Sequence, residues 1–184
     1  MSTTTHSVQI NCPTDSHINP TVQIYGTGVL SIGHNVRIDA FCIITVSEAG
    51  VEIGNNIHIG AGTYLFGGGA KIHLKDYACT STRCMIFTSS DDFVAGYPVG
   101  PMVPAEYRSV YSAPVTLEEY AAIGCSTIIF PGVTMEWGSI AGTGCVVKDS
   151  VARGQVVVGN PQRILKARNL DKLKEIDERL HNRS

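Results

Sequence analysis

The 184-residue chain has few of the features that mark several classes of protein. Charged residues make up only 16% of it and the net charge is -2, which disfavours nucleic acid or an anionic membrane as a partner. No apolar run approaches the roughly 18 residues of a membrane span. The start, MSTTTHSVQINC, lacks a basic stretch followed by an apolar one, so we expect no signal peptide. These absences predict one domain over residues 1–184, in the cytoplasm, without a nucleic-acid or membrane partner.

The cysteines and histidines lack the spacing of metal sites. The six cysteines contain no CxxC pair, and the histidines contain no HxxxxH pair. A γ-class carbonic anhydrase, which shares the repeat described below, would need three histidines around zinc. Cys42, Cys84 and Cys145 recur where a small apolar side chain belongs, and a buried thiol packs as a small hydrophobe. We therefore expect no metal and a reduced, cytoplasmic chain.

What the chain does contain is a period of six residues. From Leu117 to Val151 an aliphatic or small residue returns every six positions, with another small or β-branched residue four places later. An amphipathic helix would repeat at about 3.6 residues and an ordinary strand at 2. A period of six is typical of a parallel β-helix built from hexapeptides. The pattern extends back to Ile18, which predicts a β-helix over residues 18–160.

Four steps of the repeat are longer than six: 24 to 32, 44 to 53, 65 to 74 and 86 to 117. If three hexapeptides make one triangular coil, all four fall at the same corner of the prism. The prism would then hold three columns of inward side chains. They are Ile18, Ile38, Ile59, Thr80, Ile123 and Ala141; Ile24, Ile44, Leu65, Ile86, Ile129 and Val147; and Ile32, Ile53, Leu74, Leu117 and Met135.

Two segments depart from the repeat. Residues 88–112 form a long protruding loop, rich in proline, glycine and tyrosine, and its aromatic residues argue against disorder. We interpret this loop as a wall of the active site, with an arm between subunits as the alternative. Residues 161–184 are charged, with leucine and isoleucine at nearly helical spacing, which predicts a C-terminal α-helix that covers the last coil.

Three motifs resemble a known family: SSDDFxxxYxxxPMVPxEY (89–107), IFPGVT (129–134) and VVVGNPQRILKAR (156–168). Together with the hexapeptides they are similar to the left-handed β-helix acyltransferases, in particular the sugar acetyltransferases of surface-polysaccharide pathways. The resemblance implies an all-β left-handed parallel β-helix and a homotrimer with acetyl-CoA between adjacent prisms. It also implies that the basic end of the chain, with Arg163 and Lys166, holds the CoA phosphates.

A column of small residues fits the groove that this resemblance implies. Gly60, Ser81, Gly124 and Gly142 each follow an inward residue on one face, so they stack almost without side chains. A pantetheine arm could lie along them and bond to backbone amides. The alternative is that these glycines only satisfy the turn geometry. We list Gly124, Gly142, Arg163 and Lys166 as candidate cofactor-binding residues.

The catalytic candidates are Asp91, Asp92 and His58. Many relatives place a histidine in the loop that leaves the prism here, whereas this chain has two aspartates. A free aspartate, with a pKa of about 3.9, is a poor base unless its surroundings raise that value, so loop capping is the alternative role. His58 faces outward just before the Gly60 column and suits acid–base work. His73, Tyr97 and Tyr107 are weaker candidates for binding the substrate.

An amine acceptor suits this set of residues better than an alcohol. An amine is a nucleophile once it is deprotonated, whereas a hydroxyl normally needs a stronger base. The sequence therefore favours N-acetylation of a nucleotide-linked amino sugar by acetyl-CoA. A sugar O-acetyltransferase and a trimeric scaffold without activity stay open as alternatives.

Overall fold

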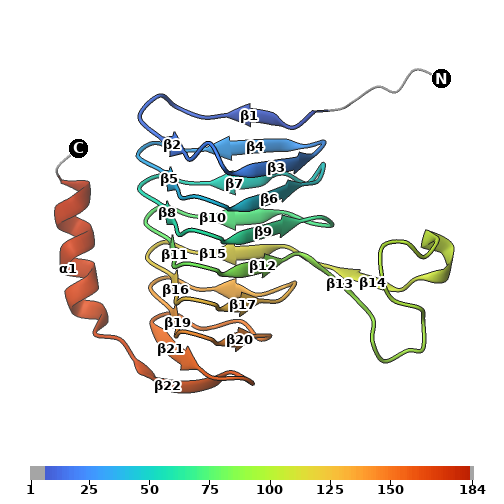
Figure 1. The fold of residues 1–184 in the computed structure, drawn as a ribbon. Coiled ribbons are helices and arrows are strands. Elements are labelled where there is room, and N and C mark those ends of the chain that lie inside the picture. Colours follow the sequence, from blue (N-terminus) through green and yellow to red (C-terminus); the bar gives the residue numbers. More distant parts are fainter. Residues whose placement is uncertain (1–6, 183–184) are drawn as a thin grey trace.

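The computed structural model describes residues 7–182, which form a three-sided parallel β-helix with one long excursion and a C-terminal helix (Figure 1). The first six residues, part of the predicted start without a signal peptide, lie outside this description, as do the last two. Sheet A contains β1 (Gln9–Asn11), β4 (Val29–Ile32), β7 (Val51–Ile53), β10 (Ile72–Leu74), β15 (Val115–Leu117) and β18 (Thr134–Met135). Sheet B contains β2 (His17–Ile18), β5 (Arg37–Ile38), β8 (His58–Ile59), β11 (Cys79–Thr80), β16 (Ala122–Ile123), β19 (Ile140–Ala141), β21 (Gln155–Val158) and β22 (Arg163–Ala167). Sheet C contains β3 (Gln23–Gly26), β6 (Ile43–Val46), β9 (Tyr64–Gly67), β12 (Met85–Phe87), β17 (Ile128–Ile129) and β20 (Val146–Val147).

The registers confirm all three predicted columns. On sheet B, Ile38 pairs with Ile59 and Thr80 with Ile123; on sheets C and A the same one-coil pairing joins the other predicted members. Nearly all of these side chains are fully buried. Burying one such aliphatic side chain contributes roughly 1.5–3 kcal/mol, so the columns are the main source of stability. Cys42, Cys84 and Cys145 are buried as expected, and burial raises the pKa of the Cys84 thiol to about 11.

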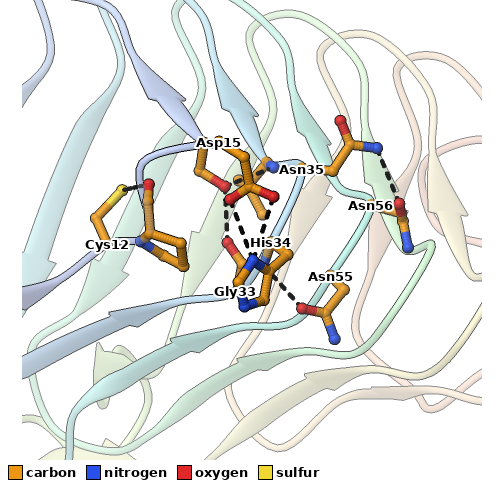
Figure 2. A network of polar contacts seen from close by, with 10 residues as sticks. Cys12, Asp15, Gly33, His34, Asn35, Asn55 and Asn56 are labelled. Carbon is orange, nitrogen blue, oxygen red and sulfur yellow. Dashed lines mark hydrogen bonds and ion pairs between the residues drawn. The ribbon is translucent and has the colours of Figure 1, made fainter.

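The corner that joins sheet A to sheet B, hereafter the A/B corner, carries a polar ladder from coil to coil (Figure 2). Asn35 and Asn56 adopt positive φ there, a conformation that asparagine tolerates better than most residues. Asn35 Nδ2 donates to Asn56 Oδ1 at 2.9 Å, and the His34 backbone amide donates to Asn55 Oδ1 at 2.8 Å. These bonds tie successive coils at the tight turn and explain why polar residues recur there.

All four long steps leave the prism between sheet C and sheet A, as predicted; we call this edge the C/A corner. The longest excursion is an antiparallel hairpin of β13 (Ser89–Asp91) and β14 (Val110–Ser112), with a 3-10 helix at Ala105–Tyr107. It projects well away from the prism (Figure 1). The expected loop over 88–112 therefore has regular structure of its own.

The C-terminal helix differs from its prediction in length and place. Residues 161–169 are not helical: β22 folds back antiparallel to β21, and α1 (Leu170–His181) begins only after Asn169, whose side chain caps it. The helix does not cover the last coil, because it runs beside the prism along the A/B corner (Figure 1). Gly138 and Gly154 leave the space that Leu173 and Leu170 occupy. No helix within residues 7–182 is both long and apolar enough to cross a membrane.

Candidate active site

A cavity of about 610 Å³ lies at the C/A corner, between the base of the hairpin and the C-terminal coils of the prism. Its walls are mostly apolar and aromatic, with two carboxylates and one ammonium group among them. They are formed by Ser90, Asp91, Asp92, Phe93, Val94, Ser109, Val110, Tyr111, Phe130, Pro131 and Lys148. The Lys148 ammonium lies 5.3 Å from the centre of the Phe130 ring, close enough for a cation–π interaction. A cavity of this size and mixed lining can hold a substrate of nucleotide-sugar size.

Asp91 lies in the cavity wall but is heavily engaged. Its Oδ1 accepts hydrogen bonds from Arg108 Nη2 at 2.8 Å and Nε at 3.3 Å, and its Oδ2 accepts one from the Gly100 amide at 3.1 Å. The Arg108 guanidinium, above all, holds the pKa of the Asp91 carboxyl below its usual value. Asp91 is therefore ionised and a weak proton acceptor, so the condition for a base role is not met. An ionised carboxylate can still attract a sugar ammonium group.

Asp92 caps the turn that follows it. Its Oδ1 accepts from the amides of Val94 at 2.8 Å and Ala95 at 3.0 Å, and these bonds lower the pKa of the Asp92 carboxyl. This is the local capping that aspartate commonly provides in turns. The structure thus supports the capping alternative for Asp92 more than the base role.

His58 belongs to a cluster on the outer face of sheet B. Its Nε2 lies 2.7 Å from Asp39 Oδ2 and 2.9 Å from Arg37 Nη2, and Arg37 Nε lies 3.1 Å from Asp39 Oδ1. The hydrogen bond from His58 is the largest of the causes that lower the pKa of Asp39. Sequence reasoning missed Asp39 and Arg37. The repeat could have found them, because Arg37 pairs with His58 one coil away.

The three candidate substrate residues do not line the cavity. His73 faces outward from sheet A, with its Nε2 3.7 Å from Glu52 Oε2. Tyr97 and Tyr107 lie in the outer part of the excursion and are more than half exposed. Tyr111, a loop tyrosine that was not among the candidates, is the tyrosine that forms part of the wall.

None of the four candidate cofactor-binding residues lines the cavity. Gly124 and Gly142 lie where sheet B turns into sheet C, the B/C corner. A Cβ on Gly124 would meet the Thr143 amide nitrogen at 2.6 Å, so close stacking of coils already requires glycine there. Arg163 and Lys166 are exposed on β22.

The GNPQR motif also reaches the cavity wall. Gln162, which precedes Arg163, accepts a hydrogen bond from the Lys148 amide at 2.7 Å. Within one chain, however, sheet C separates the B/C corner, where Gly124 and Gly142 lie, from the cavity at the C/A corner. One chain therefore does not bring all predicted site residues together.

The outer face of sheet C, between those two corners, is strongly apolar. Its half-buried members are Ile43, Tyr64, Phe66, Met85, Phe87, Ile128, Phe130 and Val146. The Phe66 and Phe87 rings stack with centroids 4.8 Å apart. Contiguous apolar surfaces of this kind mark interaction sites on soluble proteins.

Known proteins similar to this chain share its fold and much of its sequence. No family model matches it. The dTDP-4-amino-4,6-dideoxy-D-glucose acyltransferase of Escherichia coli is 35% identical over 160 residues, which cover 87% of this chain and 82% of the relative. AntD, an N-acyltransferase from Bacillus cereus solved with dTDP and 3-hydroxybutyryl-CoA, superposes with a TM-score of 0.84 at 34% identity, over 95% of this chain and 90% of AntD. An AntD variant bound to dTDP-4-amino-4,6-dideoxyglucose and coenzyme A gives 0.85 at 35% identity over the same shares.

Two residue types varied in the AntD structures recur in this chain at the same spacing. They include variants substituted at a serine and at an aspartate ten positions later in that chain. Ser81 and Asp91 repeat these residue types at the same spacing, one in the small-residue column and the other in the cavity wall. Sequence reasoning counted Ser81 only as a small side chain.

Proposed function

The chain belongs to the hexapeptide-repeat N-acyltransferases with a left-handed β-helix, and we propose that it acetylates the amino group of a dTDP-linked 4-amino-4,6-dideoxy sugar. The acyl donor is acetyl-CoA, and the product serves surface-polysaccharide assembly such as O-antigen or capsule. The observation that carries this proposal is the match to AntD over nearly the whole of both chains. The E. coli relative carries the same class of substrate in its name.

The reaction joins the sugar nitrogen to the thioester carbonyl carbon and breaks the carbon–sulfur bond. The amine must lose a proton, and the thiolate of CoA must gain one. Asp91 and Lys148, of opposite charge in one cavity, suit the sugar amine and the nucleotide diphosphate respectively. The aromatic wall of Phe93, Tyr111 and Phe130 suits a flat base.

We propose that the active enzyme is a homotrimer whose neighbouring prisms pack through sheet C. A neighbour on this face would place its own Ser81 edge and glycine column near the hairpin of the first chain. The apolar face between cavity and column supports this arrangement, because burying it removes exposed aromatic surface from water. In this arrangement CoA lies along Gly124 and Gly142, with Arg163 and Lys166 toward its phosphates.

We place the enzyme in the cytoplasm, without a nucleic-acid or membrane partner. All six cysteines are free, and three of them are buried in the prism. This supports a reducing compartment. Acetyl-CoA and nucleotide sugars are made in such a compartment as well.

The test is a thiol-release assay with acetyl-CoA and a panel of nucleotide sugars. We expect release with dTDP-4-amino-4,6-dideoxyglucose and none with dTDP-glucose, which carries a hydroxyl in place of the amine. The product should be an amide, which resists hydroxylamine and is identified by mass spectrometry. Transfer to hydroxyl sugars alone would make the protein an O-acetyltransferase, and an absence of release with every sugar would contradict the proposal.

A further inference from the structure

The reaction needs a proton acceptor, and the two hairpin aspartates are poorly suited to that task. Asp91 is held by Arg108 and Gly100, and Asp92 by two amides of its own turn. Each of these donors stabilises the ionised carboxylate and so weakens its attraction for a proton. A second titratable cluster, of His58, Asp39 and Arg37 on sheet B, lies near the small-residue column.

The contacts of His58 define which of its ring nitrogens can accept a proton. An ionised Asp39 can only accept hydrogen bonds and Arg37 can only donate them, so the two contacts of Nε2 require opposite states of that nitrogen. The contact with Asp39 Oδ2 is the shorter, at 2.7 Å against 2.9 Å, and Arg37 has Asp39 Oδ1 as another acceptor, so we assign the hydrogen to Nε2. The neutral ring then carries its lone pair on Nδ1. Within residues 7–182 Nδ1 has no hydrogen-bond partner, and the side chain is 38% exposed.

The position of this pair relative to Ser81 follows from the register of sheet B. His58 pairs with Cys79 and Ile59 with Thr80, so Gly60 lies directly over Ser81. Arg37 pairs with His58 and Ile38 with Ile59, so Asp39 lies next to Gly60 in the preceding coil. Ser81 and Asp39 thus flank Gly60 on opposite sides. The missing side chain at Gly60 leaves His58 beside a bare stretch of backbone that separates Asp39 from Ser81. The charged and titratable groups that face His58 are Arg37, Asp39 and Cys79.

We propose that His58 is the catalytic base of the acyl transfer and that Asp39, with Arg37 beside it, is its positioning residue. This inference rests on the proposed function. As the sugar nitrogen bonds to the carbonyl carbon, His58 Nδ1 takes the surplus proton from that nitrogen. The carbon–sulfur bond breaks, and the proton passes from His58 to the departing thiolate, which leaves as CoA thiol. Asp39 holds the Nε2 hydrogen throughout and balances the charge on the imidazolium.

The experiment compares this pair with a second pair of the same kind. His34 Nδ1 lies 3.1 Å from Asp15 Oδ1, on the exposed A/B corner (Figure 2), and supplies matched control variants. We expect His58→Ala to lower kcat by about 100-fold and Asp39→Asn by about tenfold, with both KM values unchanged. Asp39→Asn should also move the acid limb of the pH–rate profile to lower pH. Asp39→Glu should recover part of kcat, and added imidazole should partly restore His58→Ala.

His34→Ala and Asp15→Asn should leave kcat within twofold of the wild type. Variants of His58 and Asp39 that also stay within twofold would overturn the proposal. So would losses that neither move the pH profile nor respond to imidazole, because these indicate a structural role.

A ¹⁵N NMR measurement separates this inference from the proposed function. It should find the His58 hydrogen on Nε2 in the wild type, and a mixture of tautomers in Asp39→Asn. An inactive wild type would contradict the proposed function alone, whereas a His58 ring with its hydrogen on Nδ1 would overturn the dyad whatever the activity.

Discussion

Two histidine–aspartate pairs of this protein have the same separation in sequence and very different surroundings. His34 and Asp15 lie 19 residues apart, as do His58 and Asp39, and each pair joins adjacent coils. The first lies on the A/B corner, where the side chains are 72% and 53% exposed (Figure 2). The second lies on the flat outer face of sheet B, at 38% and 30%, with Arg37 bound to the same carboxylate.

The same histidine–aspartate contact therefore has different surroundings at a corner and on a sheet face of one repeat. At the corner the His34 amide also bonds to Asn55, so that the pair belongs to a ladder that closes the turn. On the sheet face the pair stands beside the glycine column, where a substrate can approach. Solvent screens the exposed pair more strongly, so a charge there does less to its partner.

Deleting each pair completely should give the largest difference between the two. Removing His58 and Asp39 together should lower kcat by about 100-fold, no more than His58→Ala alone, because residues that act as a unit are not additive. Removing His34 and Asp15 together should leave kcat within twofold. Steady-state kinetics with the amino-sugar substrate measure both, and losses that simply add would show that Asp39 does not act through His58.

A second prediction asks whether the sheet-B pair depends on a neighbouring chain. Phe87→Glu introduces a charge on the apolar face of sheet C and should dissociate the proposed trimer, with a loss of activity of more than about tenfold. Lys174→Glu, on the exposed side of α1, is the matched control and should change neither property. Analytical ultracentrifugation and the thiol-release assay report the two outcomes. A monomeric Phe87→Glu enzyme with full activity would show that the site is complete in one chain.

A third prediction concerns stability against pH. The folded-state pKa of Asp39 is lowered, so its ion pairs stabilise the fold above the unfolded-state pKa and lose that effect as the pH falls through the folded value. Asp39→Asn should therefore cost about 0.5–1 kcal/mol of unfolding free energy at pH 7, and the cost should fade below about pH 4. Asp15→Asn should give a smaller change. Urea unfolding at pH 7 and below about pH 4 measures the unfolding free energy of each variant. A cost for Asp39→Asn that stays constant with pH would contradict this prediction.

A fourth prediction, with no effect on activity, concerns the contact of α1 with the A/B corner. Tyr120 donates a hydrogen bond from its hydroxyl to Asp177 of the helix, and burial above all raises the pKa of that hydroxyl. Tyr120→Phe should lower the melting temperature by a few degrees through the loss of about 1 kcal/mol. Because this contact is remote from the His58 cluster, kcat should not change. A fall in kcat would connect the helix to catalysis.

The prism could be predicted from the sequence because each of its inward residues repeats a local rule. Ile38, Ile59 and Thr80 stack one coil apart since a hexapeptide fixes both where a side chain points and where the next one lies. The segment at 161–169 could not be predicted in this way. Its charged residues suit a helix or an exposed strand equally, and the pairing of β22 with β21 decided between them.

The three-sided solenoid, the edge from which the insertions leave and the family motifs all follow from the spacing of residues along the chain. The ionisation and hydrogen bonding of the candidate acids and bases depend instead on contacts made in the folded protein. The capping of Asp92 by its own turn is local and was among the roles expected from the sequence. Asp91 and His58, in contrast, carry no mark in the sequence of Arg108 or of Asp39. These partners come from the other arm of the hairpin and from another coil, and they set the charge and direction of each group through contacts in space.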